Sequence, residues 1–224
     1  MTLPRIAPYP MPEEPPPTRV GWRPERDRCA LLVHDMQRYF LGAFRADAEP
    51  VPALLRNVRA LRDRCADLGI PVIYTVQPGS QSSAERGLLR AFWGEGLRDE
   101  ERHTAVVPEV APRAGDTVLT KRRYSAFARS RLAELLRGAG RDQLVVCGVY
   151  AHIGVLMTAC DAFMRDIEPF VVADAVADFS AADHAMALDY AARRCAAVTT
   201  ARAVLEDLDR AVPGRNGAVP AGDR

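Results

Sequence analysis

The sequence lacks the features that mark disulfide-stabilised, zinc-binding and membrane-spanning proteins. Its five cysteines are odd in number and never form a C-x-x-C pair, which argues against a disulfide framework or a cysteine-based zinc site. No run of 18 apolar residues is present, and the N-terminus has no apolar signal core. We therefore expect a soluble protein of the reducing cytoplasm, without a metal and without a membrane partner.

An excess of charge of one sign is also missing. The 30 basic and 29 acidic residues give a formal net charge of +1, and no Lys/Arg cluster offers a surface for nucleic acid. The 48% hydrophobic and 26% charged content is that of an ordinary globular protein. A length of 224 residues suits one full-sized domain.

The two ends of the chain differ from the middle. Residues 1–28 hold eight of the 17 prolines, so they cannot form a helix and should run extended. Residues 29–210 are expected to form the domain, and residues 211–224 a disordered tail. Two interpretations of the arm stay open: a leader without fixed structure, or an arm packed on the domain or on a partner subunit through four apolar residues, Ile6, Tyr9, Met11 and Trp22.

Short apolar runs alternate with helical patterns through the middle of the chain. The runs predict six strands, at residues 29–33, 72–76, 117–120, 143–146, 169–173 and 197–199. Helical spacing predicts helices at residues 50–68, 128–137, 180–195 and 201–208, the third capped by Ser180. This alternation indicates an α/β fold with three layers, in which helices cover both faces of a six-stranded parallel sheet.

In such sheets, ligands bind beyond the carboxyl ends of the strands. Four residues of suitable chemistry follow strand ends here and could converge: Asp35, Gln77, Lys121 and Tyr150. A buried position would raise the pKa of Asp35 and keep part of it protonated, whereas a nearby Lys121 would lower that pKa. An anionic substrate would offset the lysine, so protonation and substrate binding should be coupled.

The stretch 147–163, CGVYAHIGVLMTACDAF, is the centre of the predicted site. It reads as a strand that turns directly into a helix, an arrangement that leaves backbone N–H groups free to bind an anion. Gly154 occupies the first turn, where a nucleophile would be well placed. We expect a site that holds an anionic substrate without attacking it covalently. His152 should orient this turn, and His34 should be a structural residue on the other side of its strand from Asp35.

Three motifs carry a specific resemblance: HDMQRYF around Asp35, KRRYSAF from Lys121, and GVYAHIGV around Gly154. With them the chain resembles the isochorismatase-like hydrolases of the cysteine-hydrolase superfamily, which have a Rossmann-like three-layer fold. The resemblance implies that Asp35 and Lys121 are catalytic and that no cofactor is needed. Amidases of the superfamily carry a nucleophilic cysteine at the position of Gly154, so this chain departs from their chemistry.

Within that superfamily, YTVQPG, FWG and ADAVADFS look like the phenazine-pathway hydrolases of 2-amino-2-deoxyisochorismate. The resemblance implies a non-proline cis peptide in the 148–151 turn and substrate-binding roles for Gln77 and Arg86. It also implies that aromatic side chains form walls of the substrate pocket and that residues of the turn complete it. These further binding residues are Phe40, Trp93, Tyr124, Phe127, Tyr150, Ala151 and Gly154.

The implied reaction is hydrolysis of an enolpyruvyl vinyl ether, in which Asp35 protonates the methylene carbon and water traps the oxocarbenium ion. The products would be trans-2,3-dihydro-3-hydroxyanthranilate and pyruvate.

The alternative substrate is isochorismate, as in siderophore biosynthesis. We expect no fused carrier domain after residue 210, which favours the amino substrate. A non-catalytic binding module and an amidase are two further alternatives. The arm and the resemblance also suggest a homodimer.

Overall fold

The computed structural model describes residues 3–210. Six strands form one sheet in the order β3-β2-β1-β4-β5-β6, and every neighbouring pair is parallel. The predicted α/β fold with a six-stranded parallel sheet is therefore confirmed. The strands are β1 (Cys29–His34), β2 (Val72–Val76), β3 (Thr117–Thr120), β4 (Gln143–Val149), β5 (Glu168–Ala177) and β6 (Ala197–Thr199).

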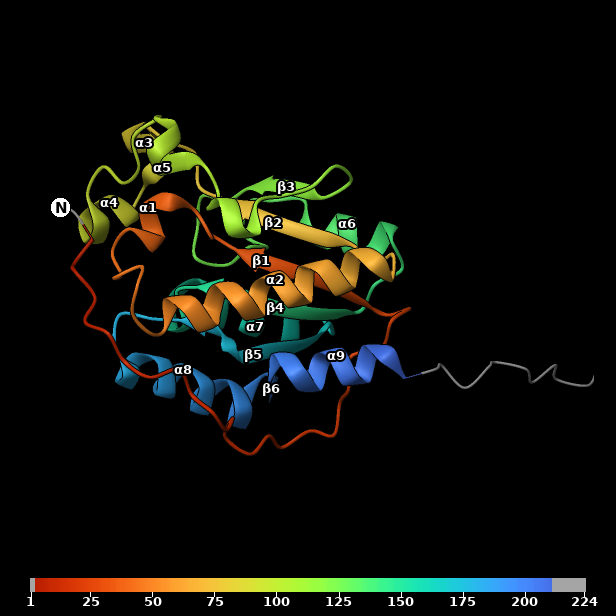
Figure 1. The fold of residues 1–224 in the computed structure, drawn as a ribbon. Helices are drawn as coiled ribbons and strands as arrows, with labels where there is room; N and C mark the ends of the chain where they lie inside the picture. Colours follow the sequence, from red (N-terminus) through yellow and green to blue (C-terminus); the bar gives the residue numbers. More distant parts are fainter. Residues whose placement is uncertain (1–2, 211–224) are drawn as a thin grey trace, which may run out of the picture.

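Helices cover both faces of the sheet (Figure 1). One layer contains α2 (Val51–Asp67) and α9 (Ala201–Asp209). The other contains α6 (Leu132–Gly138), α7 (Leu156–Phe163) and α8 (Ala181–Arg194). Short helices lie beyond the carboxyl ends of the strands or in the connections: α1 (Arg38–Leu41), α3 (Ser83–Arg86), α4 (Leu89–Trp93), α5 (Glu101–Thr104) and the 3-10 turn η1 (Pro108–Val110). None of the helices within residues 3–210 is both long and apolar enough to cross a membrane.

Alternation along β1 explains the two cores. Leu31 and Val33 face the layer of α2 and α9, whereas Ala30 and Leu32 face the layer of α6, α7 and α8. All six residues of this strand are buried, as expected for a central strand of a parallel sheet. The alternation continues to His34, whose side chain points toward the α7 layer and reaches the site described below.

Several element boundaries differ from the prediction. Strands β4 and β5 continue to Val149 and Ala177, beyond the predicted ends at 146 and 173. Helix α6 begins at Leu132 rather than 128, because Arg129 has a left-handed backbone (φ 56°) and the Ser130 hydroxyl accepts from the Leu132 N–H. The turn after β4 opens into a π-helical segment, η2 (Ala151–Val155), before α7 starts. Ser180 caps α8 as predicted, since its hydroxyl accepts from the Asp183 N–H at 3.0 Å.

The proline-rich arm packs on the domain (Figure 1, red). Ile6 and Tyr9 are 5% and 7% exposed, and Met11 and Trp22 lie partly buried against the same core. Backbone N–H groups of Ile6 and Tyr9 also donate to carbonyls of the segment between α1 and α2. Of the two interpretations of the arm, the structure supports the packed one. The tail expected at residues 211–224 lies outside the described residues.

Candidate active site

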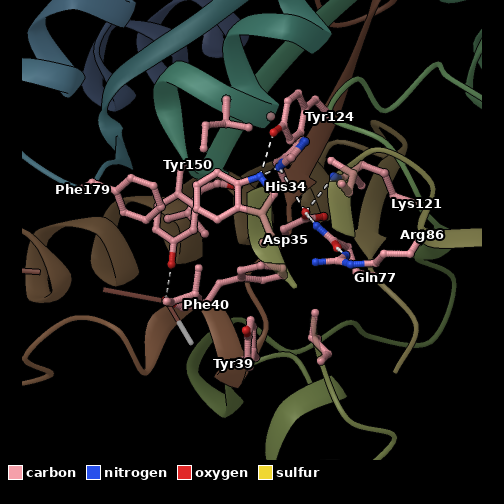
Figure 2. A pocket seen from close by; sticks show the side chains of 17 residues that line it. His34, Asp35, Tyr39, Phe40, Gln77, Arg86, Lys121, Tyr124, Tyr150 and Phe179 are labelled. Carbon is pink, nitrogen blue, oxygen red and sulfur yellow. Dashed lines mark hydrogen bonds and ion pairs between the residues drawn. The ribbon is translucent and has the colours of Figure 1, made fainter. Parts of the chain in front are cut away.

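A cavity lies beyond the carboxyl ends of β1 and β4, where the strand order reverses. It encloses about 540 Å³ of space, part of which is open to solvent. Figure 2 shows its lining, which comes from the arm, four strand ends, the 77–97 connection and the η2 turn. The lining residues are Leu3, His34, Asp35, Tyr39, Phe40, Gln77, Arg86, Leu89, Trp93, Leu97, Lys121, Tyr124, Val149, Tyr150, Ile153, Gly154 and Phe179.

Asp35 is the most heavily bonded group of the cavity. Its Oδ2 lies 2.8 Å from Nζ of Lys121 and accepts from Nε2 of Gln77 at 3.1 Å. Its Oδ1 accepts from the Thr75 hydroxyl at 2.6 Å. Asp35 also has a left-handed backbone (φ 48°), a strained conformation for a residue other than glycine. Three donors therefore fix this carboxyl group at the end of β1.

The charge balance around Asp35 favours the carboxylate. Burial raises the pKa of Asp35, but attraction to Lys121 together with the hydrogen bonds from Lys121 and Thr75 outweighs burial, so the pKa lies below its ordinary value. The first expectation, a carboxyl partly protonated by burial alone, is therefore wrong for the free protein. The second, that Lys121 lowers this pKa, is correct.

Gln77 connects Asp35 to a second cation. Its amide donates to Asp35, while its Oε1 accepts from Nη1 of Arg86 at 3.3 Å. Arg86 is 5% exposed and also donates to the Gly94 carbonyl. Within residues 3–210, no carboxylate forms an ion pair with the Arg86 guanidinium, so its charge is available to an anion entering the cavity.

Aromatic side chains form the opposite wall (Figure 2). The hydroxyl of Tyr150 donates to the Phe40 carbonyl at 2.8 Å, and its ring packs 4.3 Å from that of Phe179. The indole N–H of Trp93 donates to the Tyr124 hydroxyl at 2.7 Å. These bonds hold the aromatic wall in place, and the ring faces supply an apolar surface to a ring-shaped substrate.

The turn after β4 differs from the anion site that was expected. The non-proline cis peptide is present, between Val149 and Tyr150. However, the His152 N–H donates to Asp178, and those of Ile153 and Val155 donate to the Tyr150 carbonyl. The expectation that N–H groups of residues 150–154 together bind substrate carboxylates is therefore wrong for His152 and Ile153. His152 orients the turn as expected, since its Nδ1 also bonds Asp178 at 2.6 Å.

Nine of the eleven predicted site residues line the cavity, and their roles stay proposals. Phe127 and Ala151 do not line it. Phe127 packs in the core of the α7 layer with Arg165 over its ring, and Ala151 is buried at the start of η2. The sequence motif around Lys121 did not distinguish Tyr124, which reaches the cavity, from Phe127, which turns away.

Several cavity residues were missed. His34 lines the cavity beside Asp35, although it was expected on the other side of the strand, because β1 ends between the two residues. Its Nδ1 bonds the Val149 carbonyl at 2.8 Å. Phe179 is the phenylalanine of the ADAVADFS motif, which could have indicated it. Tyr39 and the arm residue Leu3 carried no usable signal, since a helix face and an extended arm place them.

Within residues 3–210, the cavity has neither a cysteine thiol nor a group of metal-binding side chains. None of the five cysteines is among the lining residues. No group of three or more His, Cys, Asp and Glu side chains within that range is arranged to hold a metal ion. The charged groups that line the cavity within that range are the buried carboxyl group of Asp35 and the two cations of Lys121 and Arg86.

Comparison with known proteins agrees with this geometry. The isochorismatase domain family matches residues 29–203. The chain is 52% identical to the isochorismatase of Bacillus subtilis (strain 168), covering 94% of this chain and 68% of that protein. It is 51% identical to the phenazine biosynthesis protein PhzD1 of Pseudomonas aeruginosa, covering 91% of this chain and 99% of that protein. A solved cysteine hydrolase from Pseudomonas syringae pv. phaseolicola has the same fold, with a TM-score of 0.74, 23% identity and coverage of 86% of this chain and 96% of the other.

The family matches most of the domain, and two relatives are about 50% identical to the chain. These similarities agree with the parallel sheet and with the cavity at its switch point. The chain belongs to the isochorismatase family of hydrolases.

Proposed function

We propose that this protein hydrolyses the enolpyruvyl vinyl ether of an isochorismate-type substrate, with 2-amino-2-deoxyisochorismate as the first candidate. The products would be trans-2,3-dihydro-3-hydroxyanthranilate and pyruvate. The observation that carries the proposal is the buried pair of Asp35 and Lys121, 2.8 Å apart, in a cavity where position 154 is glycine. A buried carboxyl group that can take up and deliver a proton is present, and a side-chain nucleophile at position 154 is not.

The charges of the cavity support a substrate with two carboxylates. Lys121 and Arg86 both line it, and each can pair with one carboxylate of the substrate. A carboxylate beside Lys121 offsets the attraction that keeps Asp35 ionised, so the Asp35 pKa rises when substrate binds. Substrate binding thereby prepares the acid that the reaction needs.

The reaction then proceeds in balanced steps. Asp35 gives its proton to the methylene carbon of the vinyl ether, which leaves an oxocarbenium ion stabilised by its oxygen. Water adds to this ion and gives a proton back to the Asp35 carboxylate, which leaves a hemiketal. The hydroxyl proton of the hemiketal passes to the ring oxygen as the carbonyl of pyruvate forms. Collapse of the hemiketal breaks the bond to the ring oxygen and releases pyruvate and the ring alcohol. General acid catalysis typically contributes about 10²–10⁴-fold, and positioning with fixed charges supplies the rest.

Isochorismate is the second candidate, because the Bacillus subtilis relative named isochorismatase is 52% identical. Its product would be 2,3-dihydro-2,3-dihydroxybenzoate. The two substrates differ by an amine and a hydroxyl on the same ring. Values of kcat/KM for both, measured on the same preparation, decide between them. We expect the amino substrate to be preferred.

The test of the proposal is release of pyruvate, followed with lactate dehydrogenase and NADH. We expect wild-type turnover, and a loss of about 10²–10⁴-fold in kcat for Asp35→Asn with substrate binding retained. Asp47→Asn is the matched control, since Asp47 is an exposed carboxylate paired with Arg45. Near-normal turnover of Asp35→Asn would remove Asp35 from the mechanism. Absence of pyruvate with wild-type protein would leave the non-catalytic alternative.

We also propose that the protein is a cytoplasmic homodimer. The five cysteines are all free thiols, as suits a reducing compartment. Helices α7 and α8 and the turn after α7 carry large apolar side chains that are 38–73% exposed, a composition that suits an interface between subunits: Met157, Phe163, Met164, Met186 and Tyr190. Light scattering after size-exclusion chromatography measures the mass of the assembly.

A further inference from the structure

The side chain of His34 lies between β1 and the η2 turn. It is 1% exposed, and its Nδ1 lies 2.8 Å from the Val149 carbonyl oxygen. A carbonyl only accepts, so Nδ1 carries the proton and donates it. This bond fixes the rotation of the imidazole, with the Cε1–Nε2 edge of the ring turned toward Gly154.

Gly154 leaves no room for a side chain while the ring is there. A Cβ at this position would lie 2.1 Å from Cε1, 2.7 Å from Nε2 and 3.0 Å from Nδ1 of His34. Carbon atoms in contact normally lie about 3.5–4.0 Å apart. The three nearest atoms all belong to one imidazole, so this ring is the first obstacle to any side chain larger than glycine at position 154.

The ring has few ways to move. The His34 backbone is packed closely against β4, since a Cβ on Gly148 would lie 2.2 Å from the His34 carbonyl oxygen. Rotation of the ring would break the bond to Val149 and leave a buried carbonyl without its partner, which is unfavourable. Burial lowers the pKa of His34 to about 4, so near neutrality the ring is uncharged and adds no cation beside Asp35 and Lys121.

We propose that His34 determines the reaction class of this site: its imidazole, held by Val149, occupies the volume that any side chain at position 154 would need. A side-chain nucleophile is thereby excluded from the cavity floor, and water remains as the nucleophile for the cation that Asp35 generates. His34 is a positioning residue in this sense and does not transfer a proton. The inference rests on the proposed function for the reaction class and for the activity measurement, whereas the exclusion of a side chain at position 154 rests on the contact with His34 alone.

His34→Asn separates the bond from the bulk of the ring. The asparagine amide nitrogen can take the place of Nδ1 and donate to Val149, whereas the atoms nearest Gly154, Cε1 and Nε2, are absent. The first comparison is Gly154→Ala in the wild-type and in the H34N backgrounds. In the wild-type background we expect at least an approximately tenfold loss in kcat/KM and a fall in Tm of about 2–4 °C or more, as in an overpacked core. In the H34N background we expect the same change to cost less than about threefold.

The second comparison uses a thiol as a probe of accessibility. Gly154→Cys is made with His34 and with H34N, and alkylation of position 154 by iodoacetamide is followed by peptide mass spectrometry. Wild-type protein reports the rates of the five native cysteines. We expect position 154 to react at least about ten times faster in the double variant, because only there can the thiol face the cavity.

Three results would overturn the proposal: G154A with wild-type Tm and turnover, equal losses from G154A in both backgrounds, or equal alkylation rates with and without His34. Failure of the proposed function looks different. Wild-type protein would then release no pyruvate from either substrate, while the Tm and alkylation comparisons would still report on His34.

Discussion

The ammonium group of Lys121 lies 2.8 Å from Oδ2 of Asp35, and the two side chains are only 2% and 4% exposed. A buried ion pair of this kind contributes little net stability compared with apolar residues of the same size, but removal of one partner leaves an uncompensated charge. The pair is therefore better explained by the chemistry of the cavity than by the stability of the fold.

Replacement of Lys121 by methionine should destabilise the protein in a pH-dependent way. Loss of the cation shifts the pKa of Asp35 upward, so the folded state binds its proton at higher pH than wild type does. The free energy of unfolding should fall by about 3–5 kcal/mol at pH 8, and by less as the pH decreases. Urea unfolding at pH 8 and pH 5.5 measures both values.

The double variant Asp35→Asn, Lys121→Met is the control for that experiment. It removes both charges, so most of the lost stability should return at pH 8. A double variant as unstable as K121M alone would show that packing of the lysine chain, and not its charge, caused the loss.

Arg86 should contribute to substrate binding rather than to folding. Its guanidinium has hydrogen bonds to Gln77 and Gly94 but no carboxylate partner in the described residues. We expect Arg86→Met to raise KM and to lower kcat/KM by about 10–100-fold, since a charge-assisted bond to a carboxylate is lost. Arg90→Met is the control, because Arg90 pairs with Glu95 at the surface. Equal effects of the two changes would argue against the assignment.

His34 should make the protein less stable in acid. Its folded pKa of about 4 lies below the ordinary 6.5, so between these values the unfolded chain binds a proton that the folded protein does not. The contribution of neutral His34 to the free energy of unfolding is therefore complete above pH 6.5 and is lost as the pH falls toward 4. The loss is about 3 kcal/mol, at roughly 1.4 kcal/mol per pH unit. His34→Asn should show a shallower loss over this range in urea unfolding, while its difference from wild type stays constant above pH 7. Parallel curves from pH 8 to pH 4.5 would contradict this expectation.

The arm should stabilise the domain through Tyr9. The Tyr9 hydroxyl accepts from the Asp178 N–H at 2.7 Å and lies 3.2 Å from Nδ1 of His184, in a buried network that continues to His152. We expect Tyr9→Phe to lower the free energy of unfolding by about 1–3 kcal/mol, because a buried N–H loses its partner. Arg5→Ala, an exposed change in the same arm, is the control. An unchanged midpoint for Y9F would mean that water replaces the hydroxyl.

Local patterns in the sequence determined the fold. The apolar runs at β2, β3 and β6 have the predicted bounds, because short strands between turn residues leave little freedom in their ends. Residues at strand ends, among them Asp35, Gln77 and Lys121, could be assigned to one crevice, since parallel strands end at the same edge of the sheet. Motifs then indicated the family, and glycine at position 154 indicated chemistry without a covalent intermediate.

Only the tertiary structure decided what surrounds those residues. The ionisation of Asp35 depends on two opposing effects, burial and attraction to Lys121 at 2.8 Å. Neither effect can be read from the spacing of residues along the chain. Phe127 and Tyr124 are three residues apart, yet only packing sends one to the core and the other to the cavity. The contact between His34 and Gly154 joins residues 120 positions apart, so the lack of space for a side chain at position 154 became visible only in three dimensions.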